Sequence, residues 1–230
     1  DPVQIPHLFS SPEDIEIAAF LTSIFAWGRR ETIIRNSRSL MRSMGMTPYD
    51  FVLNAGKDEI DRTGGFCHRT FQGTDCIYFI ESLRNIYTKH GGLKTLFETP
   101  VCNGGSIKES LIHFRKVFFE IPHPARTLKH IPDVGRGSTA KRLNMFLRWM
   151  VRSDNRKVDF GIWKGISPAD LFLPLDVHTG SVARNLGLLK RKSNDWKTVE
   201  EVTENLRKLD PVDPVKYDFA LFGLGIYGGF

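Results

Sequence analysis

Residues 174–188 read Pro-Leu-Asp-Val-His-Thr-Gly-Ser-Val-Ala-Arg-Asn-Leu-Gly-Leu and place one carboxylate, Asp176, between a proline turn and an amphipathic helix. Aspartate is a preferred residue directly before a helix, because its carboxylate accepts hydrogen bonds from the first free N–H groups. A second helix is expected upstream, beginning near Lys141. A lysine and an aspartate at two successive helix starts form the first candidate site of this chain.

Helical periodicity dominates the rest of the sequence, and the alternation typical of strands is nearly absent. The first helix is expected to begin at Ser11-Pro12-Glu13-Asp14 and to run to Trp27, with serine as its cap and proline in its first turn. It is apolar on almost every side, which predicts burial against several neighbours. Further helices are expected at 29–46, 75–90, 106–120, 140–152, 195–209 and 211–226. The sequence therefore predicts an all-α, multi-helix fold.

The chain has 230 residues and a formal net charge of +6, a balance that suits a polyanionic partner. Its three cysteines, Cys67, Cys76 and Cys102, are scattered, so neither a metal site nor a disulfide framework is expected. No apolar run reaches the length of a membrane span. These features favour a cytoplasmic protein without a membrane partner.

Residues 131–144 read Ile-Pro-Asp-Val-Gly-Arg-Gly-Ser-Thr-Ala-Lys-Arg-Leu-Asn and place two glycines in a tight turn directly before a helix. The N–H groups of such a turn can hold a phosphate, helped by the positive end of the helix dipole. Contacts of this kind position a nucleic-acid backbone and read no base sequence. We therefore expect nucleic-acid contacts from Gly135, Gly137, Ser138, Thr139 and Arg142.

The glycine turn, the lysine helix and the Asp176 segment together resemble the helix-hairpin-helix superfamily of DNA base-excision glycosylases. The resemblance is to a bacterial branch of endonuclease III-like and 8-oxoguanine DNA glycosylase-like proteins. Members carry a Leu-Pro-Gly-Val-Gly hairpin, a Pro-Val-Asp-Thr-His-Val-type segment, an arginine and a Leu-Gly pair. The second segment is matched here by Pro174, Asp176, His178, Arg184, Leu186 and Gly187. The resemblance spans most of the chain, and its specific part lies within residues 131–188.

This resemblance implies a single compact unit over residues 1–230, made of two packed helical lobes with a cleft between them. The hairpin-bearing lobe is expected at about 29–150, and the second lobe at 1–28 plus 151–230. A monomer is expected. The iron–sulfur cluster of some relatives needs four closely spaced cysteines near the C-terminus. None follows Cys102, so no cofactor is expected.

The hairpin departs from the family pattern, and two alignments remain open. If Val134-Gly135-Arg136 aligns with the family's Val-Gly-Arg, one residue is inserted, and Ser138 takes the nucleophile position, as in the adenine-specific mismatch glycosylase. If the apolar stripe of the helix anchors the alignment, Lys141 takes the catalytic-lysine position, and Asn144 falls where the family has Asn or Asp. We favour the second alignment, because a periodic core stripe constrains the register more strongly than a tripeptide.

With Lys141 as the nucleophile, the resemblance implies a DNA N-glycosylase that flips a damaged base, with oxidised purines favoured, into a pocket. Lys141 attacks C1′ of the sugar, expels the base and leaves a Schiff base, and elimination then nicks the strand, which is AP-lyase activity. Asp176 stays ionised and stabilises the transition state, or takes the proton from Lys141. The alternative is a non-enzymatic DNA-binding protein on the same scaffold.

The resemblance also implies a base pocket that includes Trp27 and Arg29, directly after the first helix, with His68 as a further candidate. His178 either orients Asp176 or contacts a phosphate, and Arg184 either binds phosphate or pairs with an acid. Each of these residues also has a purely structural interpretation, as core, cap or solvated surface. The expected partner is double-stranded DNA with a damaged base, which implies association with the nucleoid.

Overall fold

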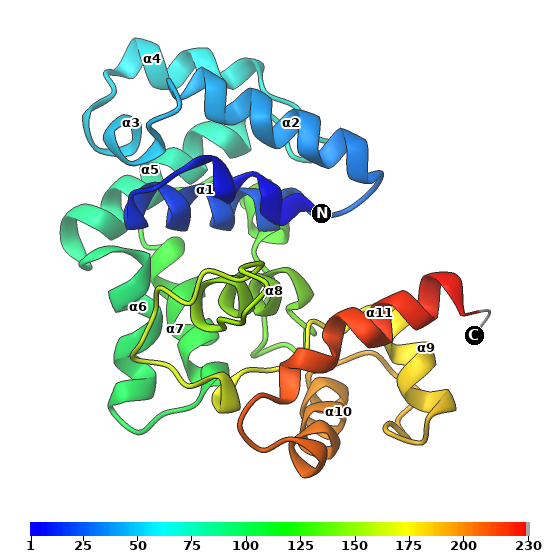
Figure 1. Cartoon of the computed structure of the whole chain (residues 1–230). Coiled ribbons are helices and arrows are strands. Elements are labelled where there is room, and N and C mark those ends of the chain that lie inside the picture. Colours follow the sequence, from blue (N-terminus) through cyan, green and yellow to red (C-terminus); the bar gives the residue numbers. More distant parts are fainter. Residues whose placement is uncertain (229–230) are drawn as a thin grey trace.

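The structure is a computed structural model that describes residues 1–228. Within this range the chain is helical, with eleven α-helices and several short 3-10 helices (Figure 1). The single β feature among the described residues is an isolated bridge between His68 and Phe71. The predicted all-α, multi-helix fold is confirmed.

Helix α1 (Pro12–Phe25) is the central element of the larger group of helices. Ser11 caps it, since its Oγ accepts a hydrogen bond from the Asp14 N–H at 3.3 Å. Every residue from Ile15 to Phe25 is buried. The helix packs against α2 (Arg30–Ser43), α3 (Pro48–Asn54) and α8 (Lys141–Val151). The buried, capped first helix is thus as expected.

The larger group is completed by α4 (Lys57–Arg62), α5 (Gly73–Lys89), α6 (Gly92–Cys102) and α7 (Ile107–Phe118). Helix α6 packs against α7 and α5. A cluster of phenylalanine rings fills the space between these helices and α1, and Phe20 contacts four of the rings. Such rings contribute a large buried apolar area and specific edge-to-face packing. The cluster consists of Phe20, Phe79, Phe97, Phe114, Phe118 and Phe146.

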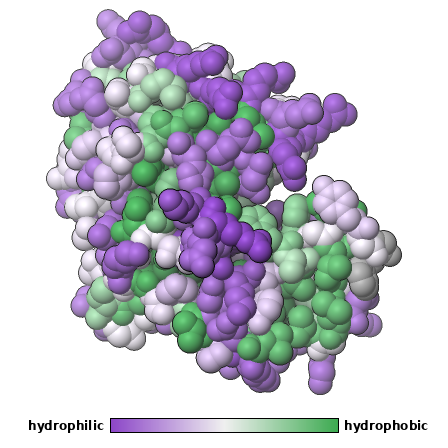
Figure 2. All heavy atoms as spheres, in the orientation of Figure 1, coloured by the Kyte–Doolittle hydropathy of each residue, from purple (hydrophilic) through white to green (hydrophobic). Residues whose placement is uncertain are grey.

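The smaller group follows α8 and contains α9 (Val177–Asn185), α10 (Trp196–Leu209) and α11 (Asp218–Tyr227). Helix α11 packs along α9, and α10 packs against the 3-10 helix η6 (Pro214–Tyr217) (Figure 1). Exposed apolar side chains of α11 gather on one face of this group (Figure 2). The other 3-10 helices are η1 (Pro2–Gln4), η2 (Pro6–Leu8), η3 (Thr63–Gly65), η4 (Ala125–His130) and η5 (Pro168–Asp170).

Helix α1 packs with α2, α3 and α8, and Glu16 in α1 accepts a hydrogen bond from Trp163 Nε1 at 2.8 Å, so the helix contacts both expected lobes. One sequence-based expectation needs correction. The helix expected at 211–226 divides into η6 and α11. The Asp210 carboxylate accepts hydrogen bonds from the N–H groups of Val212 and Asp213, which makes a turn directly before Pro214. The last two residues of the expected 1–230 unit lie outside the described residues.

A buried network of charges joins the two groups of helices. Arg148 of α8 and Arg152, directly after this helix, both donate hydrogen bonds to Asp159, at 3.3 Å and 3.0 Å. Arg152 also pairs with Asp213 at 2.8 Å, and Arg148 pairs with Asp218 at the start of α11. Breaking one partner of a buried ion pair leaves an uncompensated charge, which costs about 3–5 kcal/mol. The network therefore fixes α11 beside α8. No helix within residues 1–228 has the length and apolarity needed to cross a bilayer.

Candidate active site

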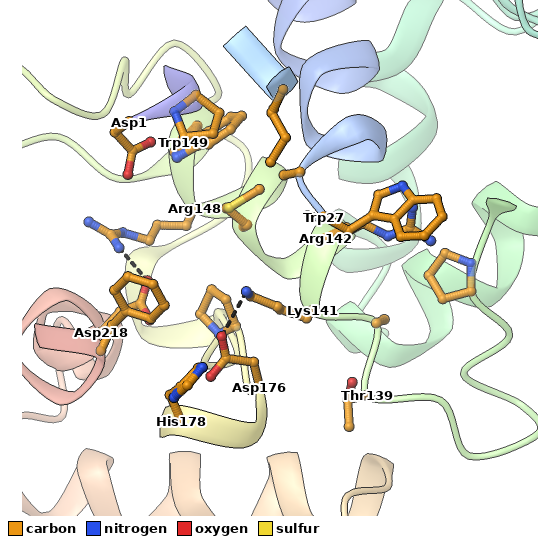
Figure 3. A pocket seen from close by; sticks show the side chains of 18 of the residues that line it. Asp1, Trp27, Thr139, Lys141, Arg142, Arg148, Trp149, Asp176, His178 and Asp218 are labelled. Carbon is orange, nitrogen blue, oxygen red and sulfur yellow. Dashed lines mark hydrogen bonds and ion pairs between the residues drawn. The ribbon is translucent and has the colours of Figure 1, made fainter. Parts of the chain in front are cut away.

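A pocket of about 520 Å³ lies where the end of α1, the face of α8, the start of α9 and the start of α11 meet (Figure 3). Helix α8 contributes Lys141, Met145 and Arg148 to its wall. These residues are four and seven positions apart, so they lie on one side of the helix. The pocket is therefore built from elements that are distant in sequence and fixed by the packing described above.

Lys141 is the first residue of α8, and the turn before it sets its direction. Ala140 has φ +48°, a left-handed conformation that side chains other than glycine rarely adopt. Its N–H donates a hydrogen bond to Ser138 Oγ at 3.3 Å. Asn144 donates to the Thr139 carbonyl at 3.1 Å and so braces the turn against the helix. This arrangement directs the Lys141 side chain into the pocket (Figure 3).

Asp176 directly precedes α9, and its two carboxylate oxygens have different hydrogen-bond partners. Oδ1 accepts the Thr179 N–H at 2.8 Å, which caps the helix. Oδ2 accepts a hydrogen bond from Lys141 Nζ, also at 2.8 Å. Burial alone raises the pKa of the Asp176 carboxyl, but the Lys141 hydrogen bond and charge, together with the Thr179 N–H, outweigh it and hold the pKa below its usual value. The pair is therefore an ionised carboxylate and an ammonium group.

A second charged pair, Arg148 and Asp218, lies on the opposite wall (Figure 3). Arg148 Nη1 donates a hydrogen bond to Asp218 Oδ2 at 2.5 Å, and the guanidinium lies 4.0 Å from the ring centroid of Phe219. Burial raises the pKa of the Asp218 carboxyl above its usual value, and the charge and hydrogen bond of Arg148 oppose this. Besides Asp1, the pocket thus contains two carboxylates, Asp176 and Asp218, whose surroundings differ.

Aromatic side chains form much of the remaining wall. Trp27 and Trp149 line it from the α1 and α8 sides, and Phe219 and Phe222 line it from α11. Lys141 Nζ lies 5.8 Å from the ring centroid of Phe222. A pocket with flat apolar walls and a few converging polar groups is typical of a site for a planar small molecule or base.

The structure brings many of the predicted site residues to this pocket. Lys141, Asp176, Ser138, Thr139, Trp27, His178 and Arg142 all line it. The Arg142 guanidinium, however, donates to the carbonyls of Ile24 at 2.6 Å and His130 at 3.2 Å. Burial lowers the pKa of Arg142 to about 10. Its hydrogen bonds join α8 to α1 and to η4, which is a structural role.

Other predicted residues lie away from the pocket wall. Arg29 is exposed and is not part of the lining. His68 is 1% exposed and stands behind Trp27, where Nε2 lies 3.3 Å from the Trp27 carbonyl and Nδ1 lies 3.1 Å from Asn36 Nδ2. The expectation that His68 lines the base pocket is therefore corrected: it supports Trp27 from the core side.

The glycines and Arg184 also lie outside the lining. Gly135 and Gly137 are in the turn before α8, and the Gly137 carbonyl accepts the Trp196 N–H at 2.9 Å. The Arg184 guanidinium donates to the carbonyl of Arg191 at 2.8 Å and to Asn194 Oδ1 at 2.7 Å. Arg184 thus holds the loop before α10, and these bonds occupy the groups expected to bind phosphate.

The sequence did not predict the wall that α11 and the later turns of α8 form. The residues of this wall are Met145, Arg148, Trp149, Asp218, Phe219 and Phe222. The spacing of Arg148 from Lys141, seven residues on one helix face, was an available signal. Among residues 1–228, no group of three or more His, Cys, Asp or Glu side chains is arranged to hold a metal ion.

The fold and the pocket define an all-helical protein with a half-buried lysine–aspartate ion pair at the N-termini of two helices. The chain belongs to the family described as "Protein of unknown function (DUF2400)", whose model matches residues 1–227. No curated protein matches the chain. No solved structure matches it either.

Proposed function

We propose that this chain is a DNA base-excision glycosylase with AP-lyase activity, and that its pocket receives a flipped damaged base, with oxidised purines favoured. One observation carries the proposal: Lys141 Nζ and Asp176 Oδ2 are 2.8 Å apart in the wall of a pocket of about 520 Å³. A nucleophilic amine beside a carboxylate is the pair that displacement at a sugar carbon requires. The volume lies within the range of about 300–1,000 Å³ that small-molecule sites occupy.

In this proposal, η4, the turn at 133–138 and α8 form the helix-hairpin-helix motif, and the pocket belongs to the cleft between two helical lobes. The motif binds the DNA backbone through N–H groups of Gly135, Gly137, Ser138 and Thr139. Two of these residues, Ser138 and Thr139, line the pocket, which supports an approach of the backbone from that side.

The proposed reaction begins with loss of the ammonium proton of Lys141 to water, either directly or through Asp176, which passes the proton on and is ionised again. The free amine attacks C1′, and the bond between C1′ and the base breaks with both electrons leaving on the base, which takes up a proton. The nitrogen then loses its second proton, and the C1′–O4′ bond opens as O4′ is protonated, which leaves the Schiff base. Ionised Asp176 stabilises the positive charge that develops at C1′.

Double-stranded DNA containing a damaged base is the proposed partner, bound by a monomer in the nucleoid of the cytoplasm. The formal net charge of +6 supports a polyanionic partner. Aromatic walls at Trp27 and Phe222 support stacking of an extruded base.

Borohydride trapping tests the proposal. The protein is incubated with duplexes that carry 8-oxoguanine, uracil or an abasic site, and borohydride is added. A covalent complex that is lost in Lys141→Ala and retained in Ser138→Ala supports the lysine mechanism. Base release without trapping, lost in Ser138→Ala, points to the alternative alignment with Ser138. Binding of duplex without either reaction favours the non-enzymatic DNA-binding protein.

A further inference from the structure

Helix α2 carries a row of arginines with a single acid among them, Glu31, which lines the same groove as Arg35, Arg38 and Arg42. Five arginines lie at or within the helix, and a sixth comes from the turn at His68–Phe71. Among the described residues, none of the six makes an ion pair, whereas Arg148, Arg152 and Arg191 elsewhere are all paired. We define this arginine row as Arg29, Arg30, Arg35, Arg38, Arg42 and Arg69.

The row faces outward because the other side of α2 is buried. Ile33, Ser37, Leu40 and Met41 pack against the body of the protein. Arg35 and Arg42 are exposed and Arg38 is half-buried, with its Nε buried and without a hydrogen-bond partner. These three arginines line a shallow groove on the helix surface. Figure 2 shows hydrophilic side chains over this part of the molecule.

The row begins at the pocket. Arg30 lines the pocket, and the Arg69 guanidinium lies 4.5 Å from the ring centroid of the pocket residue Trp27. Gly28 leaves room for it, since a Cβ there would lie 2.6 Å from Arg69 Nη1. Asn36 on α2 donates to the Cys67 carbonyl at 3.2 Å, which joins the turn that carries Arg69 to the helix. The charges thus form one continuous surface that leads away from the pocket.

The dimensions of the row fit a nucleic-acid strand. Arg35 and Arg42 are seven residues apart, which is about 10 Å along the helix axis. One strand of a duplex advances about 3.4 Å per phosphate, so this distance covers about three phosphates. A helix that binds a membrane surface needs an exposed apolar face. The apolar face of α2 is buried, so phosphates of nucleic acid are the favoured partner.

We propose that the arginine row binds the phosphate backbone of the DNA strand that flanks the nucleotide held in the pocket. This inference rests on the proposed function for its choice of DNA. It adds a second contact surface, separate from the turn at 133–138, that holds the duplex without reading its sequence.

The salt dependence of binding to a lesion-free duplex tests the row. The affinity is measured by fluorescence anisotropy at several salt concentrations for the wild type and for Arg35→Ala/Arg38→Ala/Arg42→Ala. Three lost phosphate contacts should reduce the slope of log affinity against log salt by about 2.7, at about 0.9 per phosphate. Arg35→Ala/Arg42→Ala, which leaves half-buried Arg38 in place, should reduce it by about 1.8. Replacement of all three by lysine should leave the slope unchanged.

The matched control removes three exposed positive charges elsewhere, in Lys89→Ala/Lys116→Ala/Lys164→Ala. Its slope should change by less than about 1, which is less than one phosphate contact by the same measure. The proposal that the row binds DNA would be overturned if the slope fell equally in the control and in the arginine variants. It would also be overturned if the slope did not change in the arginine variants. Binding of the wild type to vesicles of anionic lipid but not to duplex would overturn it in favour of a membrane.

The outcomes for the row and for the enzyme are distinct. Borohydride trapping of the wild type on an abasic duplex is measured alongside the slopes. Neither trapping nor base release from the lesion-bearing duplexes, with the slope reduced only in the arginine variants, overturns the glycosylase and leaves the row in place. Trapping with unchanged slopes in the arginine variants overturns the row alone.

Discussion

Arg148 on α8 and Asp218 at the start of α11 form an ion pair in the wall of the pocket, with Nη1 and Oδ2 2.5 Å apart. The same guanidinium donates through Nε to Asp159 at 3.3 Å. Arg148 is 1% exposed, so one buried arginine compensates two carboxylates that the fold has removed from water. The position of α11, and with it the wall formed by Phe219 and Phe222, depends on this pair.

Substitution of Arg148 by methionine should therefore be strongly destabilising. The variant keeps a side chain of similar length but leaves Asp159 without one partner and Asp218 without its ion pair. We expect a loss of about 3–5 kcal/mol in the free energy of unfolding, as for other buried pairs that lose one member. Urea unfolding followed by circular dichroism measures it.

An exposed arginine provides the control for this loss. Arg62 pairs with Glu59 at 3.8 Å on the surface, with 76% and 50% of their side chains exposed. Arg62→Ala should cost less than about 1 kcal/mol, the usual range for exposed pairs. Equal losses in the two variants would contradict the role given to Arg148.

Substitution of Asp176 by asparagine should produce a stability loss that depends on pH. Asparagine caps a helix as well as aspartate does, so the change removes mainly the charge that faces Lys141. The folded-state pKa of Asp176 lies below its usual value of 3.8. The ion pair therefore contributes stability at and above pH 5, and this contribution is lost as the pH falls through 3.8 and on through the folded-state pKa.

Unfolding curves of the wild type and Asp176→Asn between pH 7 and pH 2 measure this difference. The gap should be largest at neutral pH and close to zero at the acid end. A double-mutant cycle with Lys141→Met isolates the pair, because the coupling energy should follow the same pH course. A gap that stays constant from pH 7 to pH 2 would contradict the assignment of the charge to Asp176.

Local sequence patterns were enough to predict that Lys141 and Asp176 each lie at the start of a helix. The cap at Ser11, the apolar first helix, the start of α8 near Lys141 and the cap at Asp176 all depend on residues within one or two helical turns. Contacts that join distant segments were not accessible in this way. Asp218 lies 70 residues from Arg148, so no pattern within α8 indicates this partner.

Charged side chains were the most difficult to place. Arg148 is buried because four aspartates surround it and Arg152, namely Asp154, Asp159, Asp213 and Asp218. Arg184 turns to loop carbonyls because the chain after α9 folds back over it. Helical periodicity indicates which face of a helix is exposed to water. It does not identify a distant residue that can pair with a charged side chain and so allow its burial. The same gap explains why His68 was expected in the pocket and lies behind Trp27.

Substitution of Ala140 by glycine tests the backbone turn that orients Lys141. Ala140 has φ +48° and is 2% exposed, whereas Ala18 in α1 is also buried but helical. Both substitutions remove a buried methyl group, but only Ala140→Gly relieves a left-handed conformation, which costs about 1–2 kcal/mol in a residue with a side chain. Glycine also costs about 1 kcal/mol inside a helix, which adds to the loss in Ala18→Gly only. Ala140→Gly should therefore destabilise less than Ala18→Gly by about 2–3 kcal/mol in thermal unfolding. A difference of about 1 kcal/mol or less would show that the turn carries no strain.

Two glycines of α11 give a matched pair for the contact between α11 and α9. A Cβ on Gly225 would lie 3.0 Å from the His178 Cβ, and 3.2 Å from its backbone, whereas a Cβ on Gly223 meets nothing within 4 Å. Gly225→Ala should push α11 away from α9, lower stability by about 1–3 kcal/mol and displace Phe222 from the pocket. Gly223→Ala should stabilise the helix by up to about 1 kcal/mol, since alanine is the better helix former. Thermal unfolding measures both changes, and a Gly225→Ala variant as stable as Gly223→Ala would show that the two helices do not pack at this distance.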